Sequence, residues 1–319
     1  MVCNGKGTRE WLTREDSASP TAAHESIMLM AVINAKEGQD VMCADLPNGF
    51  IQTEMPKVEK GEERIIMKIT GVLVDMLVQL NPQLYGPCVV YEKNHKVSHI
   101  QVLRAIHGML QLSLLWYKKL RKDLEEQGFE FNPYDPCVAN QVKKDKQHTV
   151  VFHVNDLKSS HVDSKVSDEF AKWSESKYGE HGKVKTHHGK VYNYPRMRFD
   201  YSKKGKVKVD MTSCVEDMLN EFPKKPQENE MAMMPAADNL FSKGHGKKPN
   251  QEHGENFHHV VTKGLFISKR ARPNIQPMIA GLCARVKEPD ETDWSKLMRL
   301  MKYLNGTRKR KLTLSADDL

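Results

Sequence analysis

The sequence has no paired cysteines and no long apolar run, and these absences remove several large classes of protein. Its six cysteines include no Cys-x-x-Cys pair, which argues against a zinc ribbon or a disulfide framework and favours a reducing compartment. No apolar run reaches the length of a membrane span, and the N-terminus lacks the apolar core of a signal peptide. We therefore expect an intracellular protein, in a cytoplasmic particle or the nucleus, that is not secreted and has no membrane partner.

Aromatic residues are scarce at 7%, whereas charged residues reach 28%, a balance typical of a soluble globular protein rather than a disordered one. The 319 residues suffice for about two or three subdomains and a real core. No internal repeat is visible. The formal net charge of +8 favours polyanionic partners such as nucleic acid, although many soluble proteins carry a similar charge.

Apolar spacing and turn residues predict a mixed α+β organisation, in which hairpins are interleaved with helices. Residues 114–127 have helical spacing and end before a glycine, and 212–222 are expected to form a second helix. The apolar stretch 71–80 predicts a short buried helix that ends at an Asn-Pro pair. Residues 88–103 predict one hairpin, and the basic stretch 183–208 predicts one or two more.

Two segments carry carboxylates at the ends of apolar runs. Asp45 precedes a Pro-Asn-Gly sequence, and the Asn155–Asp156 pair separates an apolar run from the polar stretch 158–160. Because Asn and Asp tolerate the backbone angles of a tight turn, we expect a hairpin with Asp156 at its tip. Taken singly, each carboxylate is more simply interpreted as a turn residue. Together they outline a two-metal site for phosphoryl transfer.

A series of motifs follows along the chain in a distinctive order. Asp45 is followed five residues later by an aromatic, Phe50. The other motifs are Ala105-Ile106-His107-Gly108-Met109-Leu110-Gln111 followed by Trp116-Tyr117, then Asp135-Pro136-Cys137-Val138, then His153-Val154-Asn155-Asp156, and finally Arg270-Ala271-Arg272-Pro273-Asn274-Ile275 and the segment 294–307. Their order and spacing resemble the reverse transcriptase, an RNA-directed DNA polymerase, of copia-type LTR retrotransposons (Pseudoviridae-like). The resemblance runs from about residue 10 to the C-terminus.

The resemblance implies an α+β polymerase fold. Its palm and fingers would be built on an antiparallel sheet with flanking helices, and a partial thumb and a connection region would follow. We expect residues 1–208 to form the palm and part of the fingers, and residues 209–255 to form a thumb-like helix and a linker. Residues 256–319 would be the connection region, with the RNase H domain absent.

The resemblance also implies roles for individual residues. Asp45 would bind two Mg²⁺ ions, or Mn²⁺, and Asp156 would help to hold one of them beside an incoming deoxynucleoside triphosphate. Phe50 would lie under the sugar of the nucleotide and disfavour a 2′-hydroxyl group. Gly108 would let the backbone approach the template–nucleotide pair, and Gln111 would belong to the same substrate-binding segment.

Basic residues are expected to bind the RNA or DNA template–primer by neutralising its phosphates. The candidates are Lys203, Lys204, Arg308, Lys309 and Arg310. Lysine and arginine runs are more often simply solvated surface, so this assignment depends on the resemblance.

The sequence also departs from the pattern of the family. Asn155 replaces the first aspartate of the hairpin pair, so the site loses one of three anions, and His153 replaces the usual tyrosine. These departures indicate a truncated, degenerate copy whose polymerase activity is impaired. A second hypothesis is a non-catalytic remnant that still binds nucleic acid. A third is an unrelated basic α+β protein, which would be favoured if Asp45 and Asp156 lay far apart.

Overall fold

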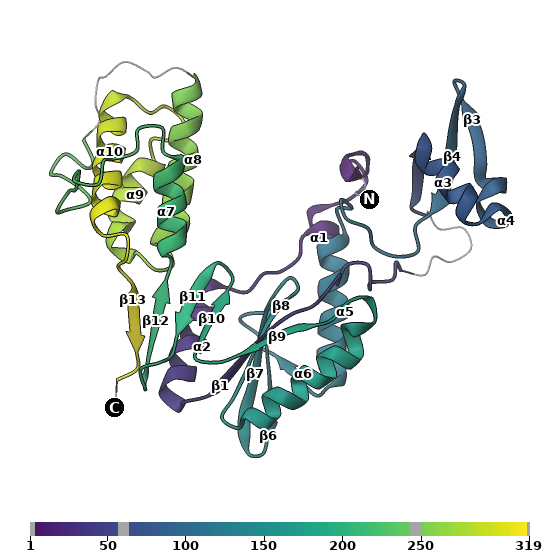
Figure 1. The fold of residues 1–319 in the computed structure, drawn as a ribbon, viewed down its shortest axis with the longest axis horizontal. Helices are drawn as coiled ribbons and strands as arrows, with labels where there is room; N and C mark the ends of the chain where they lie inside the picture. Colours follow the sequence, from purple (N-terminus) through teal and green to yellow (C-terminus); the bar gives the residue numbers. More distant parts are fainter. Residues whose placement is uncertain (1–3, 57–63, 243–250, 318–319) are drawn as a thin grey trace. The chain divides into compact units, whose positions relative to one another are not determined.

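The computed structural model of the chain describes residues 4–56, 64–242 and 251–317 and is drawn in Figure 1. The chain divides into two compact units, each made of three segments. Unit 1 comprises Met1–Ala22, Ala44–Leu157 and Asp168–Thr186. Unit 2 comprises Ala23–Cys43, Lys158–Ser167 and His187–Leu319.

Three sheets and their flanking helices make up the fold. The strand order of the largest sheet is β5-β6-β7-β8-β1-β9, and the division between the units falls within three of its strands: β1 (Asp40–Asp45), β8 (Asp156–His161) and β9 (Lys185–His188). The other sheets have the orders β10-β11-β12-β13 and β2-β4-β3, and their pairings are antiparallel. The α+β class predicted from the sequence is therefore confirmed.

Unit 1 contains three consecutive antiparallel strands. They are β5 (Glu130–Phe131), β6 (Val138–Lys143) and β7 (Lys146–His153). The turn residues between β6 and β7 are Lys144 and Asp145, with φ of 52° and 59°, the left-handed pair that joins strands with their natural twist. Short helical turns begin the unit at η1 (Gly5–Thr8) and α1 (Arg14–Ser17).

Two helices pack on one face of strand β7. Tyr117 of α5 (Leu112–Glu126) lies 6.0 Å from Phe152, and Phe170 of α6 (Ser164–Tyr178) lies 5.5 Å from His148, measured between ring centroids. Residues 148 and 152 are separated by an even number of positions, so they face the same side of the strand. The buried stripe of α5 includes Trp116, Leu120 and Leu124, as its helical spacing predicted.

A buried carboxylate joins α5 to the end of α6. Asp123 accepts hydrogen bonds from Lys119 Nζ at 2.6 Å and from Tyr178 Oη at 2.7 Å, and forms an ion pair with Lys177 at 3.0 Å. Burial by itself would raise the pKa of Asp123, but these donors outweigh that effect and lower it. The carboxylate is therefore charged and shared by both helices.

We expect Asp123→Asn to lower the free energy of unfolding by about 1–3 kcal/mol at pH 7, because two ammonium groups lose their common anion. The lowered pKa means that this contribution is complete above the ordinary pKa of an aspartate and is lost as the pH falls through the folded-state value. Urea unfolding at pH 7 and at acidic pH measures both effects. Glu125→Gln is the matched control, because the Glu125–Arg121 pair is exposed and should contribute less than about 0.5 kcal/mol. Equal losses for the two variants would contradict the prediction.

The three-stranded sheet of unit 1 carries a helix whose environment was wrongly predicted. Its strands are β2 (Ile66–Thr70), β3 (Val89–Glu92) and β4 (His95–Gln101), and the helical segments between them are α3 (Val72–Leu80), α4 (Pro82–Tyr85) and η2 (Gly86–Cys88). Helix α3 ends at Asn81, as expected, but only Val74 is buried. Val72, Met76 and Leu80 are 57–79% exposed. Apolar residues cover more of this short helix than the sheet can bury, and the stretch 71–80 is therefore a half-covered helix rather than a buried one.

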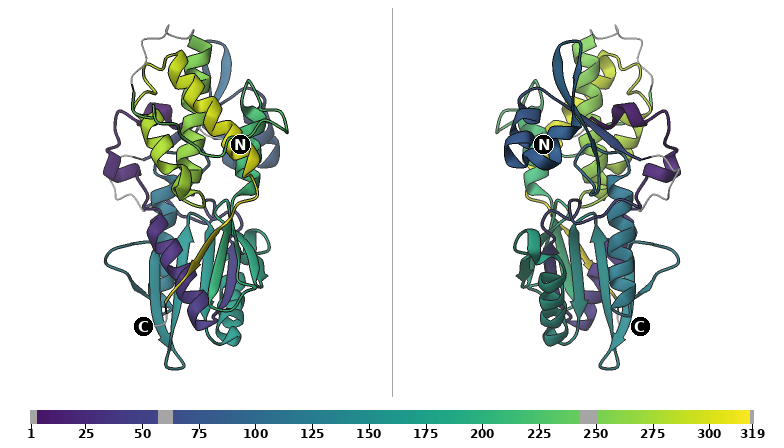
Figure 2. Two further views of the ribbon diagram at one scale, coloured as in Figure 1. Left: turned by 90° about the vertical axis from the view of Figure 1, so that its left-hand side faces the viewer. Right: turned by 90° about the vertical axis from the view of Figure 1, so that its right-hand side faces the viewer.

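Unit 2 combines a small sheet with helices. The sheet contains β10 (Val191–Tyr194), β11 (Met197–Asp200), β12 (Lys206–Asp210) and β13 (Leu312–Ser315). The helical segments are α2 (His24–Glu37), α7 (Thr212–Glu221), α8 (Gln251–Ser268), η4 (Pro273–Ile275), α9 (Gln276–Cys283) and α10 (Glu291–Gly306). Both views in Figure 2 show α8, α9 and α10 gathered together. Within this group Leu297, Met301 and Leu304 are fully buried, and their helical spacing in the sequence predicts this shared face.

The basic stretch 183–208 forms strands, as expected, and the helix predicted at 212–222 is α7. Residues 243–250 of the expected linker lie outside the described residues. No helix in the described ranges is both long enough and apolar enough to cross a membrane.

Candidate functional site

The hairpin between β7 and β8 carries the candidate acidic residues. Val154 and Asn155 form the turn, and Asp156 is the first residue of β8. The tight turn predicted from the Asn-Asp pair is therefore present but shifted by one residue. Val154 has a φ of 60°, in the left-handed region that is costly for a β-branched side chain.

Two hydrogen bonds to backbone carbonyls hold this turn. Trp116 of α5 donates from Nε1 to the carbonyl oxygen of Val154 at 2.8 Å, and the amide of Leu46 donates to the carbonyl oxygen of Asn155 at 3.0 Å. Trp116 and Leu46 are both fully buried. A helix and the segment after β1 thus fix the turn in position, and neither bond involves a side chain of the turn itself.

The segment after β1 packs closely against the same tryptophan. A Cβ atom built on Gly49 would lie 2.8 Å from Cζ2 of Trp116, so only glycine fits at this position. Asn48 donates from Nδ2 to the carbonyl oxygen of His181 at 2.9 Å, and Gln52 donates from Nε2 to the carbonyl oxygens of Pro47 and Tyr178. These anchors set the position of the residues that follow Asp45.

Asp45 and the hairpin meet at one point of unit 1. Asp45 is the last residue of β1, and its Oδ1 accepts a hydrogen bond from Nδ2 of Asn155 at 3.0 Å, although the two residues are 110 positions apart in the sequence. Nδ2 also lies 3.5 Å from the carbonyl oxygen of Leu46. All three polar side chains of the site, those of Asp45, Asn155 and Asp156, are partly exposed.

The pKa of Asp156 responds to the charge of Asp45. Burial raises the pKa of Asp156, and the negative charge of Asp45 raises it further, whereas His153 opposes the shift. A cation beside Asp156 would oppose this shift, because it would favour the charged form of the carboxylate. The hypothesis of an unrelated basic α+β protein would be favoured if Asp45 and Asp156 lay far apart, and this geometry does not favour it.

The candidate substrate residues lie on two loops of unit 1. The ring of Phe50 contacts the ring of His107 edge-on, with 5.3 Å between the centroids, which brings the segment containing Gly108 next to Phe50. Gly108 has a φ of 98°, a conformation that favours glycine. Gln111 is the N-cap residue of α5, and its carbonyl oxygen accepts a hydrogen bond from the amide of Leu115.

The candidate nucleic-acid-binding residues lie in unit 2 but do not form one group. Lys203 and Lys204 are exposed in the turn before β12. Residues 308–310 precede β13, whose first residue, Leu312, pairs with Val209 near the other end of β12. The register therefore places the two basic groups at opposite ends of one strand.

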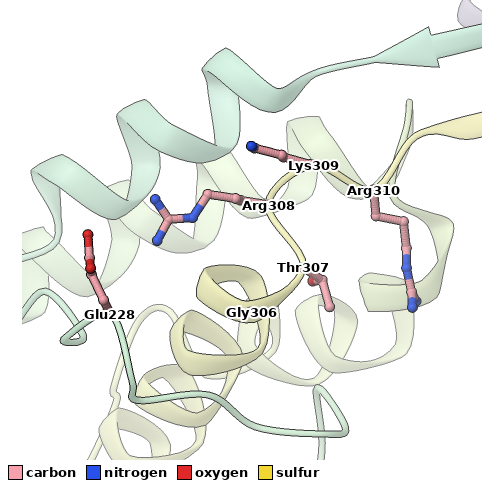
Figure 3. A pocket seen from close by; sticks show the side chains of 6 residues that line it. All are labelled: Glu228, Gly306, Thr307, Arg308, Lys309 and Arg310. Atoms are coloured by element: carbon pink, nitrogen blue, oxygen red, sulfur yellow. The ribbon is translucent and has the colours of Figure 1, made fainter.

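Residues 306–310 line a cavity of about 500 Å³ together with Glu228, as Figure 3 shows. Arg308 donates to Asn305 Oδ1 at 2.5 Å and to its carbonyl oxygen at 3.2 Å, which satisfies the C-terminal end of α10. Arg310 donates to Tyr303 Oη at 2.9 Å. Lys309 is exposed and extends to another side of the loop than Arg310 in Figure 3. Two of these three basic residues thus have structural partners.

The donors around Asp45 do not fit the pair of Mg²⁺ ions that the resemblance implies. Magnesium takes oxygen ligands, but Asn155 presents its N–H group, not its oxygen, to Asp45. Within the described ranges, no group of three or more His, Cys, Asp or Glu side chains could hold a metal ion.

Sequence reasoning missed several residues that shape the site. Trp116 was named only as part of a motif, and its hydrogen bond to the turn has no signal in the sequence. The anchors Asn48 and Gln52 and the contact of His107 with Phe50 also depend on loop geometry that spacing does not encode.

Comparisons with known proteins give limited likenesses. No protein-family model matches the chain, and a comparison with curated proteins gives no significant match. Among solved structures, the chain is similar to a foamy viral protease-reverse transcriptase (dRH) in complex with double-stranded DNA, with a TM-score of 0.48 and 10% identity over 94% of this chain and 40% of that one. It is also similar to telomerase from Candida albicans in complex with a fragment of telomeric RNA, with a TM-score of 0.32 and 8% identity over 96% of this chain and 57% of that one. The chain thus spans less than two thirds of the length of either protein.

Proposed function

We propose that the chain is a fragment of a copia-type retrotransposon reverse transcriptase whose nucleotidyl transfer is impaired by Asn155. The observation that carries the proposal is the contact between Asp45 and Asn155, which unites two motifs 110 residues apart at the end of β1 and the turn after β7. Sequence motifs at that separation meet only if the fold brings them together. In this proposal residues 1–208 are the palm and part of the fingers, 209–255 carry the thumb-like helix, and 256–319 are the connection region.

The residues of the site support roles in binding. Asp45 and Asp156 provide negative charge at the end of β1 and the start of β8, where a cation carrying the phosphates of a deoxynucleoside triphosphate would bind. Phe50, held edge-on by His107, offers an aromatic face for the nucleotide sugar. Gly108 and Gln111 belong to the neighbouring loop, and Gly108 has a positive φ of 98°, a backbone conformation that glycine adopts readily.

The template–primer is proposed to contact the exposed basic residues. Lys203, Lys204 and Lys309 are exposed and can therefore meet phosphates. Arg308 and Arg310 would have to exchange or share the partners they already have. Each phosphate contact steepens the fall of affinity with salt concentration.

Primer extension on an RNA template tests the proposal, with Mg²⁺ or Mn²⁺ present. We expect the wild-type chain to extend a primer weakly, and Asn155→Asp to raise the rate by at least about tenfold, because the third anion is restored. The double variant Asp45→Asn, Asn155→Asp is the control and should lose the gain. Template–primer binding, measured across a range of salt concentrations, provides a second readout that does not depend on turnover.

The non-catalytic alternative is favoured by one observation, the hydrogen bond that already occupies Oδ1 of Asp45. If neither the wild type nor Asn155→Asp extends a primer, while both bind template–primer with a steep salt dependence, the chain is a nucleic-acid-binding remnant. If neither protein binds template–primer at all, the reverse transcriptase assignment is wrong.

A further inference from the structure

We infer that the carboxamide of Asn155 takes the position of one cation against Asp45, so that this site binds one divalent cation where the resemblance implies two. The inference deepens the proposed function, because it rests on the identification of this point as a cation site. It concerns only side chains of unit 1, and it follows from the disagreement between the donors present and the pair of ions expected.

A hydrogen bond from Asn155 already occupies one carboxylate oxygen of Asp45. Nδ2 of Asn155 donates to Oδ1 of Asp45 at 3.0 Å, so an N–H group with partial positive charge already faces this oxygen. A Mg²⁺ ion would need to lie at about 2.0–2.1 Å from the same oxygen. The amide and a cation on that side of Asp45 therefore exclude each other.

Two neighbouring acceptors determine the orientation of the Asn155 carboxamide. Nδ2 lies between Oδ1 of Asp45 and the carbonyl oxygen of Leu46, at 3.0 Å and 3.5 Å. Rotating the carboxamide by half a turn would direct its oxygen at both of these acceptors. Without a cation, three oxygens would then face one another with no proton between them, so the amide of the metal-free chain is held with its nitrogen inward.

Two hydrogen bonds also hold the backbone of the turn. The carbonyl oxygen of Asn155 accepts from the amide of Leu46 at 3.0 Å, and that of Val154 accepts from Trp116 at 2.8 Å. Residue 155 is thus fixed relative to the end of β1. Its side chain cannot leave Asp45 by a movement of the turn unless both of these bonds break.

The charge balance of the site also favours one bound divalent cation over two. The two carboxylates of Asp45 and Asp156 carry two negative charges, which one divalent cation balances. A second cation would leave an uncompensated double positive charge in a partly buried site. An aspartate at position 155 would supply a third negative charge and remove the N–H group, so both obstacles to a second ion disappear together.

The stoichiometry of Mn²⁺ binding to the full chain, followed by electron paramagnetic resonance, tests the inference. We expect one ion for the wild type and two for Asn155→Asp. The matched control is Asn140→Asp on β6, where Asn140 Oδ1 accepts from Gln147 and Thr149 and an aspartate can do the same. This control should still bind one ion. Two ions or none in the wild type, or one ion in Asn155→Asp, would overturn the inference.

Thermal unfolding gives an independent readout. In EDTA we expect Asn155→Asp to unfold about 2–4 °C below the wild type, because three carboxylates then repel one another, and to recover when Mg²⁺ is added. The wild type should respond less to Mg²⁺ than the variant does. A wild type that binds one Mn²⁺ but no template–primer would refute the proposed function and leave this inference intact. A wild type that binds two ions and extends primers would refute this inference and support the proposed function.

Discussion

At pH 7, Lys158→Met should raise the free energy of unfolding by about 3 kcal/mol. Lys158 is only 2% exposed, and burial lowers its pKa from the ordinary 10.5 to about 8. At 1.36 kcal/mol per pKa unit, this difference corresponds to about 3 kcal/mol for keeping the ammonium group charged inside the protein. Methionine has a similar length and no charge, so it removes the cost while filling the same space.

The surroundings of Lys158 within unit 2 explain why burial dominates. With the Asn34 carboxamide oxygen turned inward, Nζ donates to it at 3.1 Å, and Nζ also lies 5.8 Å from the ring centroid of Phe199. Cys43 raises the pKa slightly, but burial has the larger effect. A neutral amide and an aromatic ring do not replace the hydration that an ammonium group loses.

The same substitution should remove a pH dependence. The folded-state pKa of Lys158 lies below that of the unfolded chain, so between about pH 8 and 10.5 the unfolded chain binds more protons. The stability of the wild type therefore rises with pH in this window, and the full cost applies below it. Chemical denaturation at pH 7 and pH 10 should show a smaller gain for Lys158→Met at the higher pH. Lys165→Met, at an exposed position, serves as the control and should change stability by less than about 0.5 kcal/mol. A gain that is equal at both pH values would contradict the explanation.

Trp116→Ala should lower the free energy of unfolding by about 3–5 kcal/mol, the usual cost of removing a fully buried large aromatic residue. Trp116→Phe keeps most of the packing but leaves the carbonyl oxygen of Val154 without its donor, and should lose about 1–2 kcal/mol. The comparison of the two variants separates the contribution of the ring from that of the hydrogen bond. Denaturant unfolding provides both values.

The loss of this bond should also appear locally. Val154 is held at a left-handed φ that is unfavourable for a β-branched residue, so the turn should open more often once Trp116 no longer donates to it. Hydrogen exchange at the amides of the β7–β8 hairpin should become faster in Trp116→Phe. Trp173→Phe is the control, because Trp173 packs against Tyr178 in the same aromatic cluster but belongs to α6. Unchanged exchange in Trp116→Phe, or equal effects of the two variants, would contradict this role.

The sequence predicted local structure where the spacing of apolar residues within one helix or strand was sufficient evidence. The stripe of α5 was evident because Trp116, Leu120 and Leu124 recur at helical spacing, and the α10 stripe was evident for the same reason. Helix α3 was found, but its burial was not, because apolar composition alone does not say whether a second layer covers the helix. The turn was displaced by one residue because a hydrogen bond from Trp116 favours a conformation that the propensity of Val154 disfavours.

The site was harder to predict, because it depends on contacts between distant segments. Spacing alone could not bring Asp45 to Asn155; the types of the residues suggested a shared site, and the resemblance to a polymerase family strengthened that expectation. The polar stretch 158–160 was expected to follow the turn as a polar segment, yet Lys158, Ser159 and Ser160 are all buried in β8. Nothing in the residue types themselves signals a buried lysine, because lysine is normally a surface residue.

The two bonds that hold the β7–β8 turn end on main-chain carbonyl oxygens, which every amino acid provides. These two bonds therefore do not depend on which side chain occupies position 155. Under the proposed function, the asparagine at position 155 would therefore alter the chemistry of the site and not its architecture, and a single nucleotide change, from an asparagine codon to an aspartate codon, would restore the acidic side chain on the same backbone.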